Sequence, residues 1–284
     1  MSGMKRYPDA MDHGSRSAKG ATNRRFRGFG SLQLGSVALL LIASGLLSSS
    51  IMVPTLGNLE KSPVGALTLA LVLEVMSWCA LPMIAWMLVA WLRSVNGLAD
   101  AQPAAARRAK LIGLILTTVV AVVSEVPYDL ANSGKVWDFD SQNPACALPI
   151  SLLVLVILEA IASPSNHTLS TAQTMMVRVV IVGAGLAWMW LLNVDVRLGI
   201  MQGGVLFLLY CLVFHFLARH ENTMMLLATL VGLVGFMIPS LGLLAVHFRR
   251  NEQEAENSRN RLYIYLLAAY ALILVVFVLA RWVH

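Results

Sequence analysis

Eight long apolar runs limit what this chain can fold into more than any other feature of the sequence. A bilayer core is about 30 Å thick, so a helix that crosses it needs about 20 mostly apolar residues. The runs occupy residues 33–54, 65–92, 109–125, 147–162, 174–192, 198–218, 223–247 and 262–283. Since 58% of the 284 residues are hydrophobic and only 13% are charged, the composition lies outside that of ordinary soluble domains. We therefore predict that lipid surrounds most of the chain.

The runs are continuous rather than alternating, which favours helices over the strands of a membrane β-barrel. The predicted fold class is all-α: a polytopic integral membrane helical bundle of about eight transmembrane helices. Residues 32–284 are expected to form one transmembrane domain, with no soluble domain beside it.

Residues 1–31 are polar and lack apolar periodicity, and they carry seven Lys or Arg residues against two Asp. This pattern predicts a disordered basic arm followed by an uncleaved first helix. The positive-inside rule then predicts a cytoplasmic N-terminus in a multi-pass protein of the plasma (inner) membrane. The net charge of +6 is interpreted as topology and contact with anionic lipid, and no nucleic-acid partner is expected.

One segment conflicts with this topology. Residues 249–261 hold four Arg and three Glu, and eight helices would place them outside although their Arg content favours the inside. The helix count after residue 146 is therefore open by one, chiefly at the short link 193–197, which is interpreted as a turn. The three cysteines and six histidines show no metal-ligand spacing, so no metal site is predicted.

Two carboxylates lie within apolar runs, where a charge costs about 2.5–3.5 kcal/mol on insertion scales. Glu159 is close to the end of its run, so its side chain is expected to reach the interface. Glu74 is ten residues inside its run. Both a structural partner and a functional role stay open for Glu74, and we include it among the candidate substrate-binding residues.

The densest polar chemistry follows the third run. Pro127 is expected to break the helix near Glu125, placing this carboxyl at a helix C-terminus, where the helix dipole and low dielectric favour its protonated form. Asp129 shares its face if a short helix restarts after the proline. Glu125 and Asp129 are therefore the candidate catalytic residues, as groups that transfer a proton. The candidate substrate-binding residues of this segment are Tyr128, Asp138, Asp140, Gln142 and Asn143. The alternative is a solvated loop with ordinary turn residues at 132–134.

This segment resembles the TraX family of membrane proteins, whose founding activity is acetylation of the N-terminus of conjugative F-pilin. Residues 124–131 read Ser-Glu-Val-Pro-Tyr-Asp-Leu-Ala, where the family typically reads Ser-Glu-Ile-Pro-Phe-Asp-Leu-Ala. Phe139-Asp140, Gln142 and Asn143 complete the motif. The resemblance covers about residues 75–162. It implies a fold akin to the broader membrane acyltransferases, acetyl-CoA or another acyl-CoA as donor, and an envelope protein or lipid as acceptor.

Three polar features of the family are missing. The family commonly has Asp-His in the first span, Arg in the span that contains a proline, and Tyr-Pro-x-His near the last helix. This chain instead has three serines at 48–50, Ser77-Trp78, and Ala269-Tyr270 without Pro or His. Acyl transfer needs a base, which is most often histidine. The serines either bond to carbonyls of their own helix or line a polar cavity.

Three classes of function stay open. The first, favoured by the resemblance, is a divergent acyl- or acetyltransferase that acts on an envelope or pilin-like acceptor. The second is a non-catalytic membrane partner in envelope or surface-appendage assembly. The third is a small transporter in which Glu74 and Glu159 relay ions.

Overall fold

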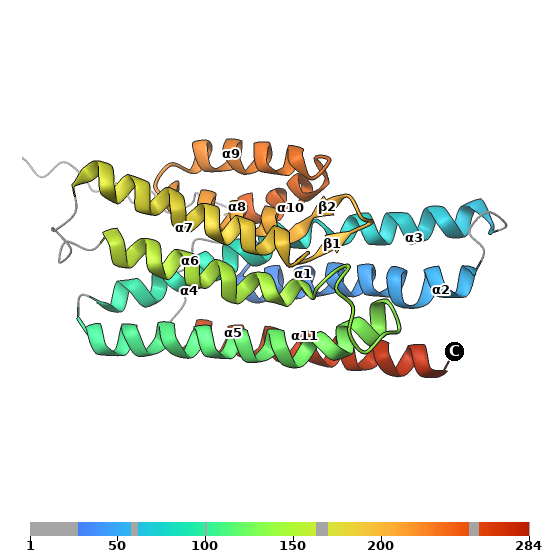
Figure 1. Cartoon of the computed structure of the whole chain (residues 1–284). Coiled ribbons are helices and arrows are strands. Elements are labelled where there is room, and N and C mark those ends of the chain that lie inside the picture. The colour runs from blue at the N-terminus through green and yellow to red at the C-terminus, as the bar shows by residue number, and fades with distance from the viewer. Residues whose placement is uncertain (1–27, 58–61, 100, 163–169, 250–255, 284) are drawn as a thin grey trace, which may run out of the picture.

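The computed structural model describes residues 28–57, 62–99, 101–162, 170–249 and 256–283. Most of the predicted basic arm, residues 1–27, lies outside this part of the chain. The described residues form an elongated bundle of roughly parallel helices (Figure 1). The main helices are α1 (Ser31–Leu47), α3 (Val64–Ser77), α4 (Ala80–Ala99), α5 (Pro103–Asn132), α6 (Ala147–Ala162), α7 (Thr171–Leu191), α8 (Gly203–Phe216), α9 (Glu221–Val234), α10 (Ile238–His247) and α11 (Glu256–Val283). The short elements are a π-helix (Ser48–Met52), α2 (Val53–Leu56), a 3₁₀ helix (Pro144–Cys146), β1 (Val196–Arg197) and β2 (Met201–Gln202).

Five helical segments of the described chain are long and apolar enough to cross a membrane, namely Ser31–Leu56, Val64–Ala99, Pro103–Asn132, Pro144–Ala162 and Thr171–Leu191. The apolar helices α8, α9 and α10 and the stretch Leu267–Ala280 of α11 are shorter. The prediction of an all-helical bundle is confirmed, and these five segments are compatible with membrane spans. The count of eight spans is not confirmed.

The expected single span at 223–247 is wrong, because it is a hairpin of α9 and α10. The chain turns at Phe236 and Met237, both with positive φ, and Ser240 Oγ donates to Thr229 O at 3.3 Å. A Cβ at Gly232 would collide with Ser240, so glycine allows the two helices to approach closely. The sequence Gly-Phe-Met-Ile-Pro at 235–239 carries the local turn signal.

This hairpin determines where residue 249, the first of the conflicting segment, lies. Arg249 Nη1 lies 3.2 Å from Glu221 Oε1, so the end of α10 meets the start of α9. Phe29 N also donates to Phe248 O at 2.9 Å. Residue 249 is therefore at the same end of the bundle as the start of α1. The Arg content of the segment that it begins predicts this same end.

The predicted break at Pro127 is also wrong, because α5 continues through the proline to Asn132. Pro127 has no N–H to bond with Val123 O, but a long apolar helix packed against neighbours tolerates this loss. The helix ends where Ser133 N and Gly134 N both donate to Asp129 O, at 2.9 and 3.1 Å. Gly134 has φ 76°, as expected for a left-handed residue after a helix end.

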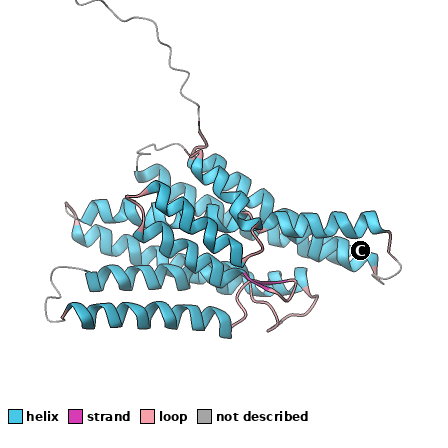
Figure 2. Cartoon of the chain, turned by 90° about the horizontal axis from the view of Figure 1, so that it is seen from above, coloured by secondary structure: helices cyan, strands magenta, loops and turns pink. Residues whose placement is uncertain are grey.

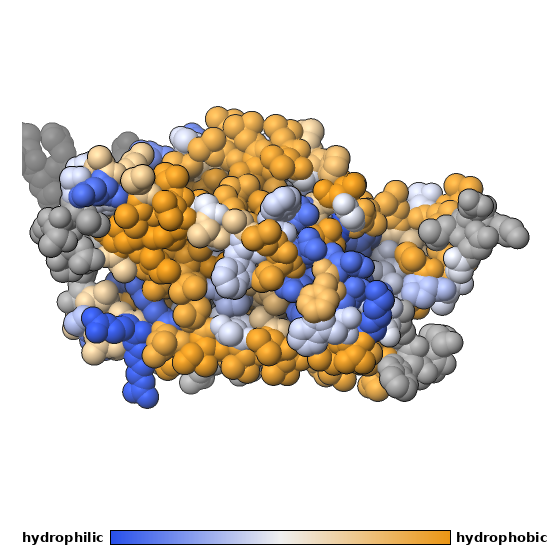
Figure 3. Space-filling view, viewed as in Figure 1, coloured by the Kyte–Doolittle hydropathy of each residue, from blue (hydrophilic) through white to orange (hydrophobic). Residues whose placement is uncertain are grey.

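The link after α7 forms an antiparallel hairpin of β1 and β2, in which Val196 pairs with Gln202. Its backbone is joined to the loop after α5, since Gln142 N donates to Asn193 O at 3.0 Å and Asp195 N donates to Gln142 O at 2.9 Å. Figure 2 shows the strands beside this loop. On the face in Figure 3, hydrophilic residues gather in the same region, within a largely hydrophobic surface.

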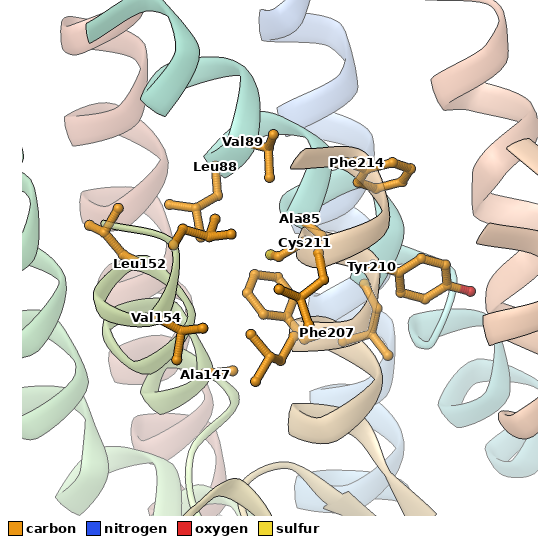
Figure 4. Close-up of a cluster of buried hydrophobic side chains, with 14 of the residues drawn as sticks. Ala85, Leu88, Val89, Ala147, Leu152, Val154, Phe207, Tyr210, Cys211 and Phe214 are labelled. Carbon is orange, nitrogen blue, oxygen red and sulfur yellow. The ribbon is translucent and has the colours of Figure 1, made fainter. Parts of the chain in front are cut away.

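The main core lies between α4, α6 and α8. Leu88, Leu152, Phe207 and Phe214 are buried there (Figure 4). Small residues bring neighbouring helices close, as expected for packing in lipid; a Cβ at Gly113 would overlap the Trp91 ring. This core holds α4 and α8 together and so fixes where the hairpin of β1 and β2 ends, because α8 follows β2 directly.

Candidate functional site

A polar cavity of about 280 Å³ lies between α1, α3, α5, α11 and the β hairpin. We call it the polar chamber. Its polar lining residues are Ser48, Ser49, Glu74, Tyr128, Asn132, Arg197 and Tyr270. The volume is close to the lower end of small-molecule sites. Of the sequence candidates, the chamber lining contains Glu74 and Tyr128.

Arg197 is the central charge of the chamber. Its Nε donates to Asp195 Oδ1 at 2.6 Å, Nη1 donates to Ser77 Oγ, and Nη1 lies 3.9 Å from Glu74 Oε1. Burial alone would lower the pKa of Arg197, but Asp195 and Glu74 raise it above its ordinary value. The guanidinium therefore stays charged inside the bundle.

The β hairpin positions this arginine in the chamber. Asp195 and Arg197 are two residues apart, and the Asp195 side chain is 1% exposed. A Cβ at Gly203 would overlap the Asp195 carboxylate, so glycine at this position lets the start of α8 pack against it. Val194, also buried, anchors the same turn beneath the loop.

The serine triplet lies in a π-helical turn that joins α1 to α2. Ser48 Oγ donates to Ala70 O of α3 at 2.7 Å, so its acceptor is a neighbouring helix and not its own. Ser48 and Ser49 line the chamber, and in the described chain the buried Ser50 hydroxyl has no partner. Single π-turns inside helices occur frequently at functional sites. Of the two expectations for these serines, the polar cavity is the one observed.

The motif at 124–131 and the residues near 143 are brought together by Asn143, which is fully buried. Asn143 Nδ2 donates to Ser124 Oγ at 2.7 Å, and its backbone N–H donates to Glu125 Oε1 at 3.3 Å. Asn143 Oδ1 accepts from Ala145 N at 2.9 Å and from the Tyr270 hydroxyl. Cys146 Sγ donates to Glu125 Oε2 at 3.5 Å. The Glu125 carboxylate thus holds the 3₁₀ helix that precedes α6, and Asn143 and Tyr270 connect it to the chamber.

Asp129 lies one turn after Glu125 on the same unbroken helix, so the two carboxylates share a face as expected. Its Oδ2 accepts from Asp138 N at 2.9 Å, and within the described chain its Oδ1 has no partner. Glu125 and Asp129 therefore each accept a backbone N–H of the loop that follows α5. Neither residue lines the chamber.

The other loop candidates lie away from the chamber. Asp138 pairs with Lys135 at 3.6 Å, and a hydrogen bond from Ser133 keeps the pKa of Asp138 below its ordinary value. Asp140 is exposed at the surface, and its N–H donates to Asp138 Oδ1 at 3.3 Å. Gln142 contributes through its backbone, by the two bonds to the hairpin. These three residues shape the loop.

A second polar cluster lies toward the other end of the bundle, around Glu159. Its carboxylate accepts from Lys110 Nζ at 2.8 Å and from Asn96 Nδ2, and His215 Nδ1 lies 4.0 Å away. Its side chain is only 15% exposed. Instead of extending to the interface as expected, Glu159 joins α4, α5, α6 and α8.

Sequence reasoning missed Asp195, Arg197 and the role of Tyr270. The available signal was an Asp-x-Arg pair in a short link between two apolar runs. Among the described residues, no group of three or more His, Cys, Asp or Glu is arranged to hold a metal ion.

A scan of protein-family models, a search of curated proteins and a search of solved structures each found no match to this chain.

Proposed function

We propose that this chain is an integral membrane acyl- or acetyltransferase, divergent from the TraX family, that acts on an envelope or pilin-like acceptor. The observation that carries the proposal is the polar chamber, in which one carboxylate and one charged guanidinium face a cavity within an apolar bundle. The family-like segment borders this chamber through Tyr128 and, by way of Asn143, through Tyr270.

The chamber supplies the two groups that acyl transfer requires. In the proposed reaction, the acceptor hydroxyl or amine attacks the carbonyl carbon of an acyl thioester, such as acetyl-CoA, and the C–S bond breaks. Glu74 takes the proton of the acceptor and passes it to the departing thiolate, as a general base and then a general acid. Arg197 donates to the carbonyl oxygen as negative charge develops there. We favour Glu74 over Glu125 and Asp129 because only Glu74 lines the chamber.

The missing arginine of the family motif supports this assignment. Ser77-Trp78 stands where the family has Arg, yet Arg197 of the hairpin donates to Ser77 Oγ. An arginine is therefore present beside this position, although it comes from a different segment. Because the family histidine is missing, we assign the role of general base to a carboxylate. Glu74 is the candidate carboxylate that faces the cavity.

Mass spectrometry of envelope proteins and lipids, from cells with and without the chain, tests this function. The expected result is the loss of an acetyl or longer acyl mass from at least one acceptor, restored by the wild-type chain. Glu74→Gln should not restore it, whereas Glu221→Gln, a matched change at the surface, should. Identical acyl patterns in all four samples would contradict the proposal.

The second candidate is a non-catalytic partner in envelope or surface-appendage assembly. One observation favours it: Glu125, Asp129 and Asn143 of the motif are occupied in holding a loop. On this alternative, the chain purifies in a stable protein complex and Glu74→Gln leaves that complex unchanged. An ion relay between Glu74 and Glu159 has less support, because each carboxylate belongs to its own cluster with different partners.

For location, we propose the plasma (inner) membrane with the N-terminus in the cytoplasm. The Arg249 end of the α9–α10 hairpin then lies on the cytoplasmic side and the chamber lies toward the opposite side. A reporter fused at residue 140 should read extracytoplasmic, and a reporter within the first 30 residues should read cytoplasmic. A cytoplasmic signal at 140 would reverse this orientation.

A further inference from the structure

A second cavity adjoins the polar chamber and differs from it in chemistry. It has a volume of about 90 Å³ and lies between α1, α4, α8, α11 and the start of α6. Its lining is almost entirely apolar and includes Ala38, Leu39, Ile84, Met87, Leu148 and Phe207. We call it the apolar pocket. Its charged lining residues in the described chain are Asp195 and Arg197, which already bind each other at 2.6 Å.

The two cavities meet at four shared residues: Ile42, Pro144, Arg197 and Tyr270. Arg197 and Tyr270 present polar groups at this junction, and Ile42 and Pro144 present apolar ones. A molecule with its polar head in the chamber therefore has an apolar space directly beyond the arginine. This is the arrangement expected of a site for an amphiphile, because each part of such a ligand is matched by a lining of its own kind.

We propose that the apolar pocket binds the short hydrocarbon chain of an acyl group whose carbonyl lies beside Arg197. This inference rests on the proposed function and names its substrate class: acyl donors with chains of a few carbons. The pocket has about a third of the volume of the polar chamber, so we expect it to hold a chain of a few carbons. Long fatty chains exceed this space.

Ile42 determines how long a chain the pocket accepts, because it lies at the junction on α1 and lines both cavities. On this proposal, a larger side chain at this position obstructs a ligand that extends from the chamber into the pocket, and a smaller one leaves it more room. Leu40 is two residues away on the same helix, is 71% exposed and lines neither cavity. It provides a matched control for an apolar substitution on α1.

The test measures equilibrium binding of acyl-N-acetylcysteamine thioesters, from acetyl to decanoyl, to the full chain in one detergent. For the wild-type chain and Leu40→Ala, affinity should rise about fourfold per methylene, as expected for about 0.8 kcal/mol per buried CH₂. The rise should stop after the first few carbons, when the pocket is full. Ile42→Trp should abolish the rise, and Ile42→Ala should move its end to longer chains.

Several results would overturn the inference. Affinity that rises over the whole series, equally in all four proteins, would mean that the probes partition into detergent and not into the pocket. An Ile42→Trp variant that melts at the wild-type temperature and keeps the wild-type chain-length profile would also contradict it. The binding assay needs no acceptor and no transfer. If affinity depends on chain length as expected but no acyl transfer occurs in cells, the proposed function alone is contradicted. If transfer occurs without a chain-length limit, this inference alone is contradicted.

Discussion

The chamber and the Glu159 cluster each place a carboxylate within an apolar helix and pair it with a cation, yet their surroundings differ. Glu159 is held by Lys110 at 2.8 Å and by Asn96, and the cluster joins four helices. Glu74 lies 3.9 Å from Arg197, which is already bound by Asp195, and Glu74 faces a cavity of about 280 Å³. A carboxylate in a membrane helix is a candidate for function by default. Both carboxylates are similarly buried, so it is the cavity beside Glu74 that distinguishes a candidate for chemistry from a structural ion pair.

The largest expected effect is on stability in the Glu159 cluster. Lys110→Met removes the cation and leaves a carboxylate that is only 15% exposed without its charged partner, which typically costs about 3–5 kcal/mol. The free energy of unfolding in a single detergent should fall by about this amount. Lys110→Arg keeps the charge and should recover most of it. A change below about 0.5 kcal/mol for Lys110→Met would mean that the ion pair contributes little, as many exposed pairs do.

A smaller effect on stability is expected at Asp129, a buried carboxylate that neither lines the chamber nor pairs with a cation within the described chain. Asp129→Ala leaves the Asp138 N–H without its acceptor and should cost about 1–3 kcal/mol, with faster hydrogen exchange at residue 138. Asp129→Asn keeps an acceptor oxygen and should cost less. If Asp129 instead transfers a proton in the reaction, Asp129→Asn should lower turnover by about 10²-fold or more with little loss of stability.

The smallest effect is expected at the surface of the same loop. Lys135→Ala breaks the 3.6 Å pair with Asp138, but the Lys135 side chain is 61% exposed. The free energy of unfolding should change by less than about 1 kcal/mol, and the difference should shrink further at high salt. A loss as large as that of Asp129→Ala would show that this ion pair, and not the buried carboxylate, holds the loop.

The fold was predictable where a single helix needs only length and apolarity. The runs at 33–54, 147–162 and 174–192 correspond closely to α1 with its π-helical turn, α6 and α7. The run at 223–247 is also apolar, but a turn at Phe236 and Met237 divides it into two short helices. Hydropathy alone does not show where a chain reverses its direction. Pro127 was expected to end α5 by the rule for helices in water, whereas α5 continues through it because neighbouring helices support its backbone.

The site was less predictable because it depends on contacts between distant segments. Glu74 was identified correctly as unusual, since its cost is a local property. Arg197 and Tyr270 could not be assigned, because their role arises only when the hairpin after α7 and helix α11 reach the same cavity. Glu125 and Asn143 were paired through the motif, and the structure brings them together, but as a support for the loop and not as part of the chamber lining.

The most direct test of the central claim is a paired measurement of acyl transfer and stability in Glu74→Gln and Glu159→Gln. For Glu74→Gln we expect transfer to fall by about 10²-fold or more with the free energy of unfolding unchanged, because Asp195 still pairs with Arg197. For Glu159→Gln we expect the free energy of unfolding to fall by about 3 kcal/mol, since Lys110 is left unpaired, with transfer per folded molecule retained. If both variants instead lose the same property, or if Glu74→Gln transfers at the wild-type rate, the distinction between the two carboxylates is wrong.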